Sequence, residues 1–171
     1  GVAQWQSFCI ELNEYVSKNH HYYIDVSNMA INGGAGGPNP DPISPETAYL
    51  YTRFLNGTLS NYNYQPGFLD RRISARNLQK AFWYLEDELD SVSGQAALWV
   101  QEAQNSGWSD TGDIMVVNLW EYDYSQGEPV RAERQSMLIG KAANVIPAPG
   151  ATLLSATGIF IVGWLRKRKY V

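Results

Sequence analysis

The sequence contains only one cysteine, Cys9, among its 171 residues. A lone cysteine excludes an internal disulfide bond and leaves three roles open: a buried bystander, a partner in an intermolecular bond, or a reactive group. Histidine is almost as scarce, with two residues, and no Cys/His spacing typical of a metal site is present. Because no phosphate-binding glycine loop occurs either, we expect no metal and no cofactor.

Basic residues are also few, with 13 Lys and Arg against 17 Asp and Glu. Four of these cations are consecutive, at Arg166, Lys167, Arg168 and Lys169. Without them, nine basic side chains remain, and the rest of the chain has a net charge near −8. Nucleic acids require a basic surface, so this balance disfavours a nucleic-acid partner.

Long apolar runs are absent except near the C-terminus, where Ala151–Leu165 carries no charge. This run is at or just under the roughly 17–25 residues that cross a bilayer as a helix. A cluster of Lys and Arg at one end of such a helix fixes that end on the cytoplasmic side. We therefore predict a transmembrane helix at about 150–165 with a basic tail at 166–169. The rest of the chain would then lie outside the cytoplasm.

A proline-rich break precedes this helix, at Pro147, Ala148, Pro149 and Gly150. The break, the apolar run and the basic tail together closely resemble the PEP-CTERM sorting signal, although Ala148 stands where that family most often has Glu. The resemblance implies export, temporary anchoring in the inner membrane, and cleavage near Pro147–Gly150 by an exosortase-type membrane protease. It also implies release to the cell surface or extracellular matrix, and a signal peptide that is removed or lies outside this numbering.

Two other interpretations of the tail are an ordinary tail anchor and a buried C-terminal core helix. Four consecutive cations disfavour the core helix, because Lys and Arg are rarely buried. In either membrane interpretation the chain divides into an extracytoplasmic domain at 1–143 and a sorting segment at 144–171. The first part is long enough for one domain with its own core.

Apolar periodicity predicts an α+β domain in which strands flank about three helices. The expected strands are Ser7–Asn13, Tyr22–Ile31, Ile114–Trp120 and Gln135–Ile139. The first expected helix starts at Pro45 after the N-cap Ser44 and runs to about Asn56, and the third spans about Gln95–Ser106. The second helix is expected to begin at the cap Ser74, with a buried stripe that includes Leu78, Ala81, Phe82, Leu85 and Leu89.

Gln79 lies on this second helix beside the buried stripe, just before Phe82 and Trp83. Cys9 follows an aromatic residue in the first expected strand. The two segments, in this order, resemble the thioester domains of bacterial surface proteins, over roughly Ser7–Leu119. The resemblance implies that Cys9 supplies a thiol, Gln79 is the acyl donor, and Phe82 and Trp83 form the wall of the site.

Such a domain would act once, not as an enzyme. An amine on an external target would attack the thioester and leave the protein covalently attached through Gln79, as an adhesin would be. The main alternative is a non-reactive structural or matrix protein of the same sorting group, in which Cys9 is simply packed.

Two further clusters have a functional and a plainer interpretation. His20-His21 would give a Cys-His hydrolase if one imidazole lay beside Cys9, but a solvated turn is the simpler expectation. The acidic run Glu86–Glu88, with Asp90, would bind a cation or a basic partner, although a solvated helix end is more common.

Overall fold

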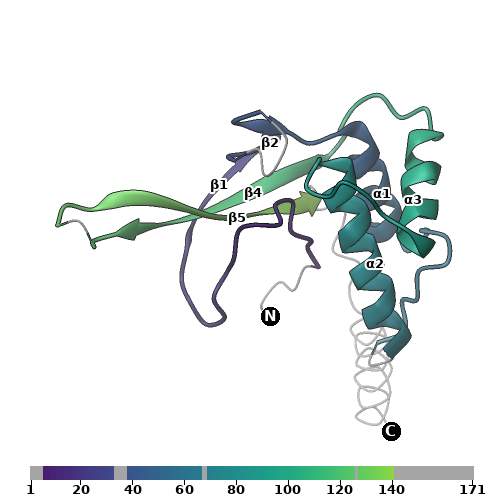
Figure 1. Ribbon diagram of the computed structural model, residues 1–171, viewed down its shortest axis with the longest axis horizontal. Coiled ribbons are helices and arrows are strands. Elements are labelled where there is room, and N and C mark those ends of the chain that lie inside the picture. Colours follow the sequence, from purple (N-terminus) through teal and green to yellow (C-terminus); the bar gives the residue numbers. More distant parts are fainter. Residues whose placement is uncertain (1–5, 33–37, 67–68, 126, 141–171) are drawn as a thin grey trace, which may run out of the picture. The chain divides into compact units, whose positions relative to one another are not determined.

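The computed structural model describes residues 6–32, 38–66, 69–125 and 127–140. These residues form an α+β domain with three helices and two antiparallel sheets, which confirms the predicted class (Figure 1). The elements are β1 (Tyr23–Ser27), β2 (Met29–Ala30), β3 (Asp41–Pro42), α1 (Pro45–Leu55), α2 (Leu69–Leu85), α3 (Gly94–Gln104), β4 (Ile114–Asp123) and β5 (Val130–Gly140). None of the described helices is long and apolar enough to cross a membrane. The predicted transmembrane helix and sorting motif lie outside the described residues.

The larger sheet has the order β1-β4-β5, and the smaller sheet pairs β2 with β3. The β4–β5 hairpin is longer than the sequence predicts, and its turn extends away from the three helices (Figure 1). The prediction stopped β4 at Trp120, where the apolar run ends. In the structure the strand continues to Asp123 because the partly buried Glu121 and the exposed Tyr122 and Asp123 still pair with Val130–Ala132.

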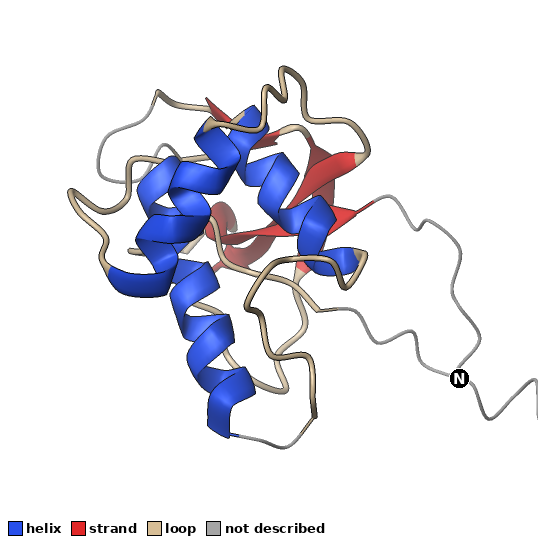
Figure 2. Cartoon of the chain, turned by 90° about the vertical axis from the view of Figure 1, so that its right-hand side faces the viewer, coloured by secondary structure: helices blue, strands red, loops and turns tan. Residues whose placement is uncertain are grey.

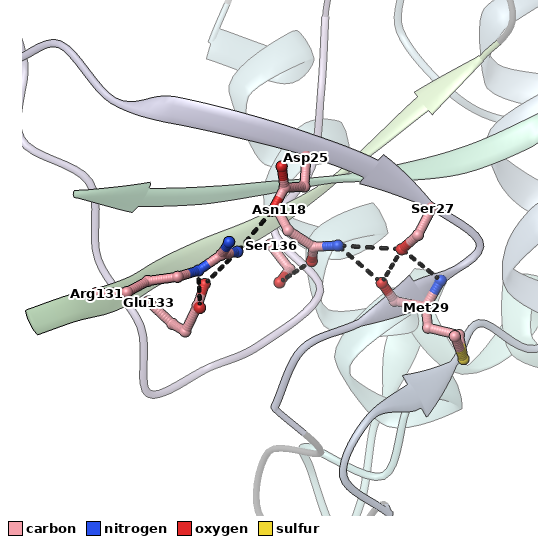
Figure 3. Close-up of polar contacts among 7 residues, drawn as sticks. All are labelled: Asp25, Ser27, Met29, Asn118, Arg131, Glu133 and Ser136. Carbon is pink, nitrogen blue, oxygen red and sulfur yellow. Dashed lines mark hydrogen bonds and ion pairs between the residues drawn. The ribbon is translucent and has the colours of Figure 1, made fainter. Parts of the chain in front are cut away.

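A buried asparagine in β4 joins the two sheets (Figure 3). The Asn118 Nδ2 donates to Ser27 Oγ at 3.1 Å and to the Met29 carbonyl at 3.0 Å, while its Oδ1 accepts from Ser136 Oγ at 2.7 Å. One side chain thus connects β1, β2 and β5 through hydrogen bonds that satisfy every polar atom of its amide. A buried polar group of this kind requires such partners, because an unpaired amide in the core is costly.

The first helix begins and ends as predicted. Ser44 is the N-cap, and its Oγ accepts a hydrogen bond from the Thr47 backbone N–H at 3.1 Å. Pro45 occupies the first helical position, where its missing N–H costs nothing. Gly57 follows the helix with φ +69, a left-handed conformation that glycine adopts without strain.

The start of α2 differs from the prediction. Ser74 is not its N-cap but lies in the second turn, where its Oγ accepts from the Asn63 backbone N–H at 3.1 Å. Residues Leu69–Ile73 contain no proline or glycine, so nothing local prevents the helix from beginning five residues earlier. Its buried stripe is confirmed for Leu78, Ala81 and Phe82.

The helices lie beside one another, and α1 also packs on β4 and β5 (Figure 2). The core between them is aromatic: the centroid of the Phe8 ring lies 5.0 Å from that of Phe54 and 5.1 Å from that of Phe82. Trp99 of α3 is fully buried and donates its Nε1–H to the Ser60 carbonyl at 2.7 Å. The buried residues of α3 lie on one face of the helix: Ala96, Trp99, Val100 and Ala103.

The predicted strand Ser7–Asn13 is much shorter in the structure, where Cys9 forms only an isolated bridge with Met137 of β5. Two backbone hydrogen bonds flank the bridge, from Ile10 N–H to the Ser136 carbonyl and from Leu138 N–H to the Phe8 carbonyl, both at 3.0 Å. In this antiparallel pattern Phe8 and Ile10 face β5 through their backbone groups. The N–H and C=O of Cys9 therefore point away from β5, toward the outer edge of the sheet.

Candidate functional site

The outer edge at Cys9 is occupied by the side chain of Gln79 from α2. The Cys9 backbone N–H donates to Gln79 Oε1 at 3.0 Å, and Gln79 Nε2 donates to the Cys9 carbonyl at 2.6 Å. The primary amide thereby takes the place that a peptide group of a neighbouring strand would have. The structure brings together the two residues that the sequence paired, by way of the backbone of Cys9.

The two hydrogen bonds between the Gln79 amide and the Cys9 backbone, called the clamp below, affect the Gln79 carbonyl. A backbone N–H directed at a carbonyl oxygen polarises the C=O bond and stabilises the oxyanion that forms when a nucleophile adds to the carbon. The donor here is the backbone of the residue that also carries the thiol, so the Gln79 carbonyl and its donor are held beside Cys9. Proximity of this kind lowers the entropic part of an addition barrier.

The Cys9 thiol is only partly accessible to solvent. Burial raises its pKa, and the carboxyl group of Glu11, when it is ionised, raises it further by charge repulsion of the thiolate. A thiol with a raised pKa is mostly protonated at neutral pH and reacts slowly with external electrophiles.

The two residues expected to form the wall have different surroundings. Phe82 is fully buried and packs in the core, with its ring 5.1 Å from Phe8 and 6.2 Å from Tyr51. This contact fixes α2 against the segment that contains Cys9, one helical turn from Gln79. Trp83 is half-buried, and its Nε1–H has no hydrogen-bond partner within the described residues. It lies four residues after Gln79, on the same side of the helix.

Glu11, the acidic residue two positions after Cys9, is only 2% exposed. Its Oε1 accepts from the Asn32 backbone N–H at 3.2 Å, and its Oε2 accepts from the Ser136 N–H at 3.4 Å. Burial raises the pKa of Glu11 to about 9, with a further contribution from the neighbouring carboxyl of Glu14. The local sequence signal for Glu11 is its place two residues after Cys9.

The acidic residues after α2 form the expected solvated helix end only in part: Asp87 and Asp90 are exposed, but Glu86 and Glu88 are buried. Glu86 is 4% exposed and accepts from the N–H and Oγ of Ser44 at 3.1 and 2.7 Å, which places its carboxyl at the start of α1. Glu88 is 5% exposed and accepts from the Leu12 N–H at 2.8 Å. The prediction was wrong for Glu86 and Glu88 because their carboxyl groups satisfy backbone donors of distant segments, which local sequence does not reveal.

The imidazole of His20 is paired elsewhere. Its Nε2 contacts Glu121 Oε2 on β4, and the Glu121 carboxylate also pairs with Arg134 at 2.7 Å. Within the described residues no contact joins a histidine to Cys9. No group of three or more His, Cys, Asp or Glu side chains in that part of the chain is placed to hold a metal ion.

Comparisons of the chain with protein-family models, with curated proteins and with solved structures find no match.

Proposed function

We propose that Cys9 and Gln79 react to form an internal thioester, and that this bond attaches the protein covalently to an external amine. The observation that supports the proposal is the reciprocal pair of hydrogen bonds between the Gln79 amide and the backbone of Cys9. The domain would accordingly be a thioester-domain-like module.

In the proposed reaction, the Cys9 thiol loses its proton and the sulfur adds to the Gln79 Cδ. The negative charge that develops on Oε1 is stabilised by the Cys9 N–H. The C–N bond then breaks, Nε2 takes up a proton and leaves as ammonia, and a thioester remains. No oxidant or reductant is involved, since a thiol and an amide give a thioester and ammonia.

The second step uses the thioester. A primary amine on the target adds to the same carbon, the C–S bond breaks, and the proton lost by the amine restores the Cys9 thiol. The target is then joined to Gln79 by an amide bond. Each molecule reacts once, so the protein acts as a covalent adhesin without turnover.

The sorting segment fits this activity. A PEP-CTERM-like signal at Pro147–Gly150, followed by Ala151–Leu165 and a basic tail, would export the chain, anchor it in the inner membrane and present it to an exosortase-type protease. Release to the cell surface or extracellular matrix would place the thioester where external amines occur.

A second candidate function rests on the same hydrogen bonds. Gln79 satisfies an N–H and a C=O that would otherwise be unpaired at a sheet edge, and this alone stabilises the fold. In that case Cys9 is only a packed residue, and the protein is a non-reactive structural or matrix component.

Intact mass of the purified full chain, with and without methylamine, separates the two functions. The thioester predicts a mass that is lower than calculated by one ammonia, and a methylamine adduct that maps to Gln79. Cys9→Ala and Gln79→Ala should both restore the unmodified mass, whereas the control Gln101→Ala, at an exposed position of α3, should behave as the parent. A measured mass equal to the calculated mass, together with alkylation of Cys9, would exclude the thioester and support the structural role.

A further inference from the structure

Glu11 contacts β5 through both its backbone and its side chain. Its backbone carbonyl accepts from Gln135 Nε2 at 2.8 Å, and its carboxyl accepts from the Ser136 N–H at 3.4 Å. The Ser136 carbonyl in turn accepts from Ile10 N–H at 3.0 Å. The side chain of Glu11 thus provides the acceptor where backbone pairing with β5 stops.

This arrangement determines where the ladder ends and therefore how Cys9 is oriented. Ile10 directly follows Cys9, and its hydrogen bond to Ser136 turns the backbone groups of Cys9 away from β5. Those groups are the ones that clamp the amide of Gln79. Glu11 acts on the clamp through Ser136 and Ile10, without touching Gln79 itself.

A second carboxyl completes the cluster. Glu14 accepts from Asn32 Nδ2 with Oε1, while its Oε2 is buried and has no partner among the other described groups. The carboxyl group of Glu14 lies near that of Glu11, and repulsion between two negative charges favours a proton on Glu11, whose pKa is raised. The neutral Glu11 carboxyl can donate that proton to Glu14 and still accept from Asn32 and Ser136.

We propose that Glu11 is a positioning residue for the Cys9–Gln79 reaction, and that it acts in the neutral form in which it shares a proton with Glu14. The effect of Glu11 on the reaction rests on the proposed function. The effect of Glu11 on the orientation of Cys9 does not require a thioester to form.

The proton makes the reaction depend on pH in a defined direction. Above the pKa of Glu11, about 9, its carboxyl ionises beside Glu14, and the new negative charge opposes the Cys9 thiolate. The other described elements contribute no opposing cation here: α2 presents Gln79, β5 presents Gln135 and Ser136, and the segment after β2 presents Asn32. The nearby Glu88, whose carboxyl accepts from the Leu12 N–H, is acidic and not a cation.

The test compares Glu11→Gln, which keeps a carbonyl acceptor and a donor toward Glu14, with Glu11→Ala, which keeps neither. The full chain is unfolded in urea and refolded between pH 6 and pH 10, and loss of ammonia is followed by intact mass. At pH 7 we expect Glu11→Gln to react within threefold of the parent and Glu11→Ala at least tenfold more slowly. At pH 10 the parent should be about tenfold slower than Glu11→Gln, because only about one tenth of its Glu11 is then neutral.

Glu128→Gln, at an exposed position beside the hairpin turn, is the control and should follow the parent at every pH. A Glu11→Gln profile parallel to that of the parent would overturn the proposal, as would normal reaction by a folded Glu11→Ala. If Glu11→Ala does not fold, the comparison between the parent and Glu11→Gln decides.

Amide hydrogen exchange at Cys9 separates this inference from the proposed function. If the parent never loses ammonia, the thioester is refuted, and exchange still reports on the clamp. Glu11→Ala should then exchange the Cys9 N–H at least tenfold faster than the parent, while Glu11→Gln should not. Unchanged protection in a folded Glu11→Ala refutes the positioning role whether or not a thioester forms.

Discussion

Replacing Glu11 by glutamine is expected to make the stability of the protein less dependent on pH. The carboxyl has a pKa of about 9 in the folded protein against 4.5 for an unperturbed glutamate. Between these two values the unfolded chain releases a proton that the folded chain keeps. The free energy of unfolding therefore falls as pH rises from 4.5 to 9, and this contribution is fully favourable only below 4.5.

The size of this effect follows from how steeply the free energy of unfolding depends on pH. One proton corresponds to about 1.4 kcal/mol per pH unit, so Glu11 should lower the free energy of unfolding by about 3 kcal/mol between pH 5 and pH 7. Glutamine resembles the neutral carboxyl in shape and carries no proton to lose. The Glu11→Gln variant should match the parent near pH 4.5 and exceed its stability by a growing margin up to pH 9.

Urea unfolding of the full chain, followed by tryptophan fluorescence at pH 5, 6, 7 and 8, measures this margin. The buried carboxyl of Glu86 also has a raised pKa, but it is present in both proteins and cancels in the difference. A difference between parent and variant that stays constant across these four pH values would refute the assignment of a neutral Glu11.

Two substitutions test the packing around the site by urea unfolding at pH 7. Phe82→Ala should lower the free energy of unfolding by about 3–5 kcal/mol, because it removes a fully buried ring that holds α2 on Phe8, whereas Leu98→Ala on the exposed face of α3 should cost under about 0.5 kcal/mol. A small loss at Phe82 would contradict the aromatic core. Asn118→Ala should cost about 1–3 kcal/mol, because it leaves buried partners in β2 and β5 unsatisfied, and a neutral result would show that water replaces the amide.

Much of the helical structure could be predicted from local signals. The Ser44-Pro45 start of α1 and the inward stripe of α3 both follow from capping chemistry and from 3.6-residue periodicity. Ser74 shows the limit of the same reasoning. A serine ahead of an apolar stripe is a common N-cap, but here its hydroxyl accepts a hydrogen bond from Asn63 and the helix continues past it.

The carboxyl groups were harder to predict, because their burial depends on partners that are distant in the sequence. Glu86 binds the start of α1, and Glu88 binds the backbone of Leu12, so neither looks buried from the acidic run in which it lies. Glu11 is held by Asn32 and Ser136 from two other parts of the fold. No local pattern indicates that a carboxyl will find backbone donors after folding.

The α+β class and the buried stripe of α2 follow from the sequence, because periodicity and capping are local properties, whereas the pairing of Cys9 with Gln79 rests on the resemblance to thioester domains. How the two residues meet depends on the tertiary structure. Bridging to Met137 turns the backbone of Cys9 outward, α2 delivers the Gln79 amide to that edge, and the buried carboxyl of Glu11 ends the ladder beside it. These relations depend on strand pairing and helix packing across distant segments, which hydrogen-bond geometry fixes only once the chain is folded.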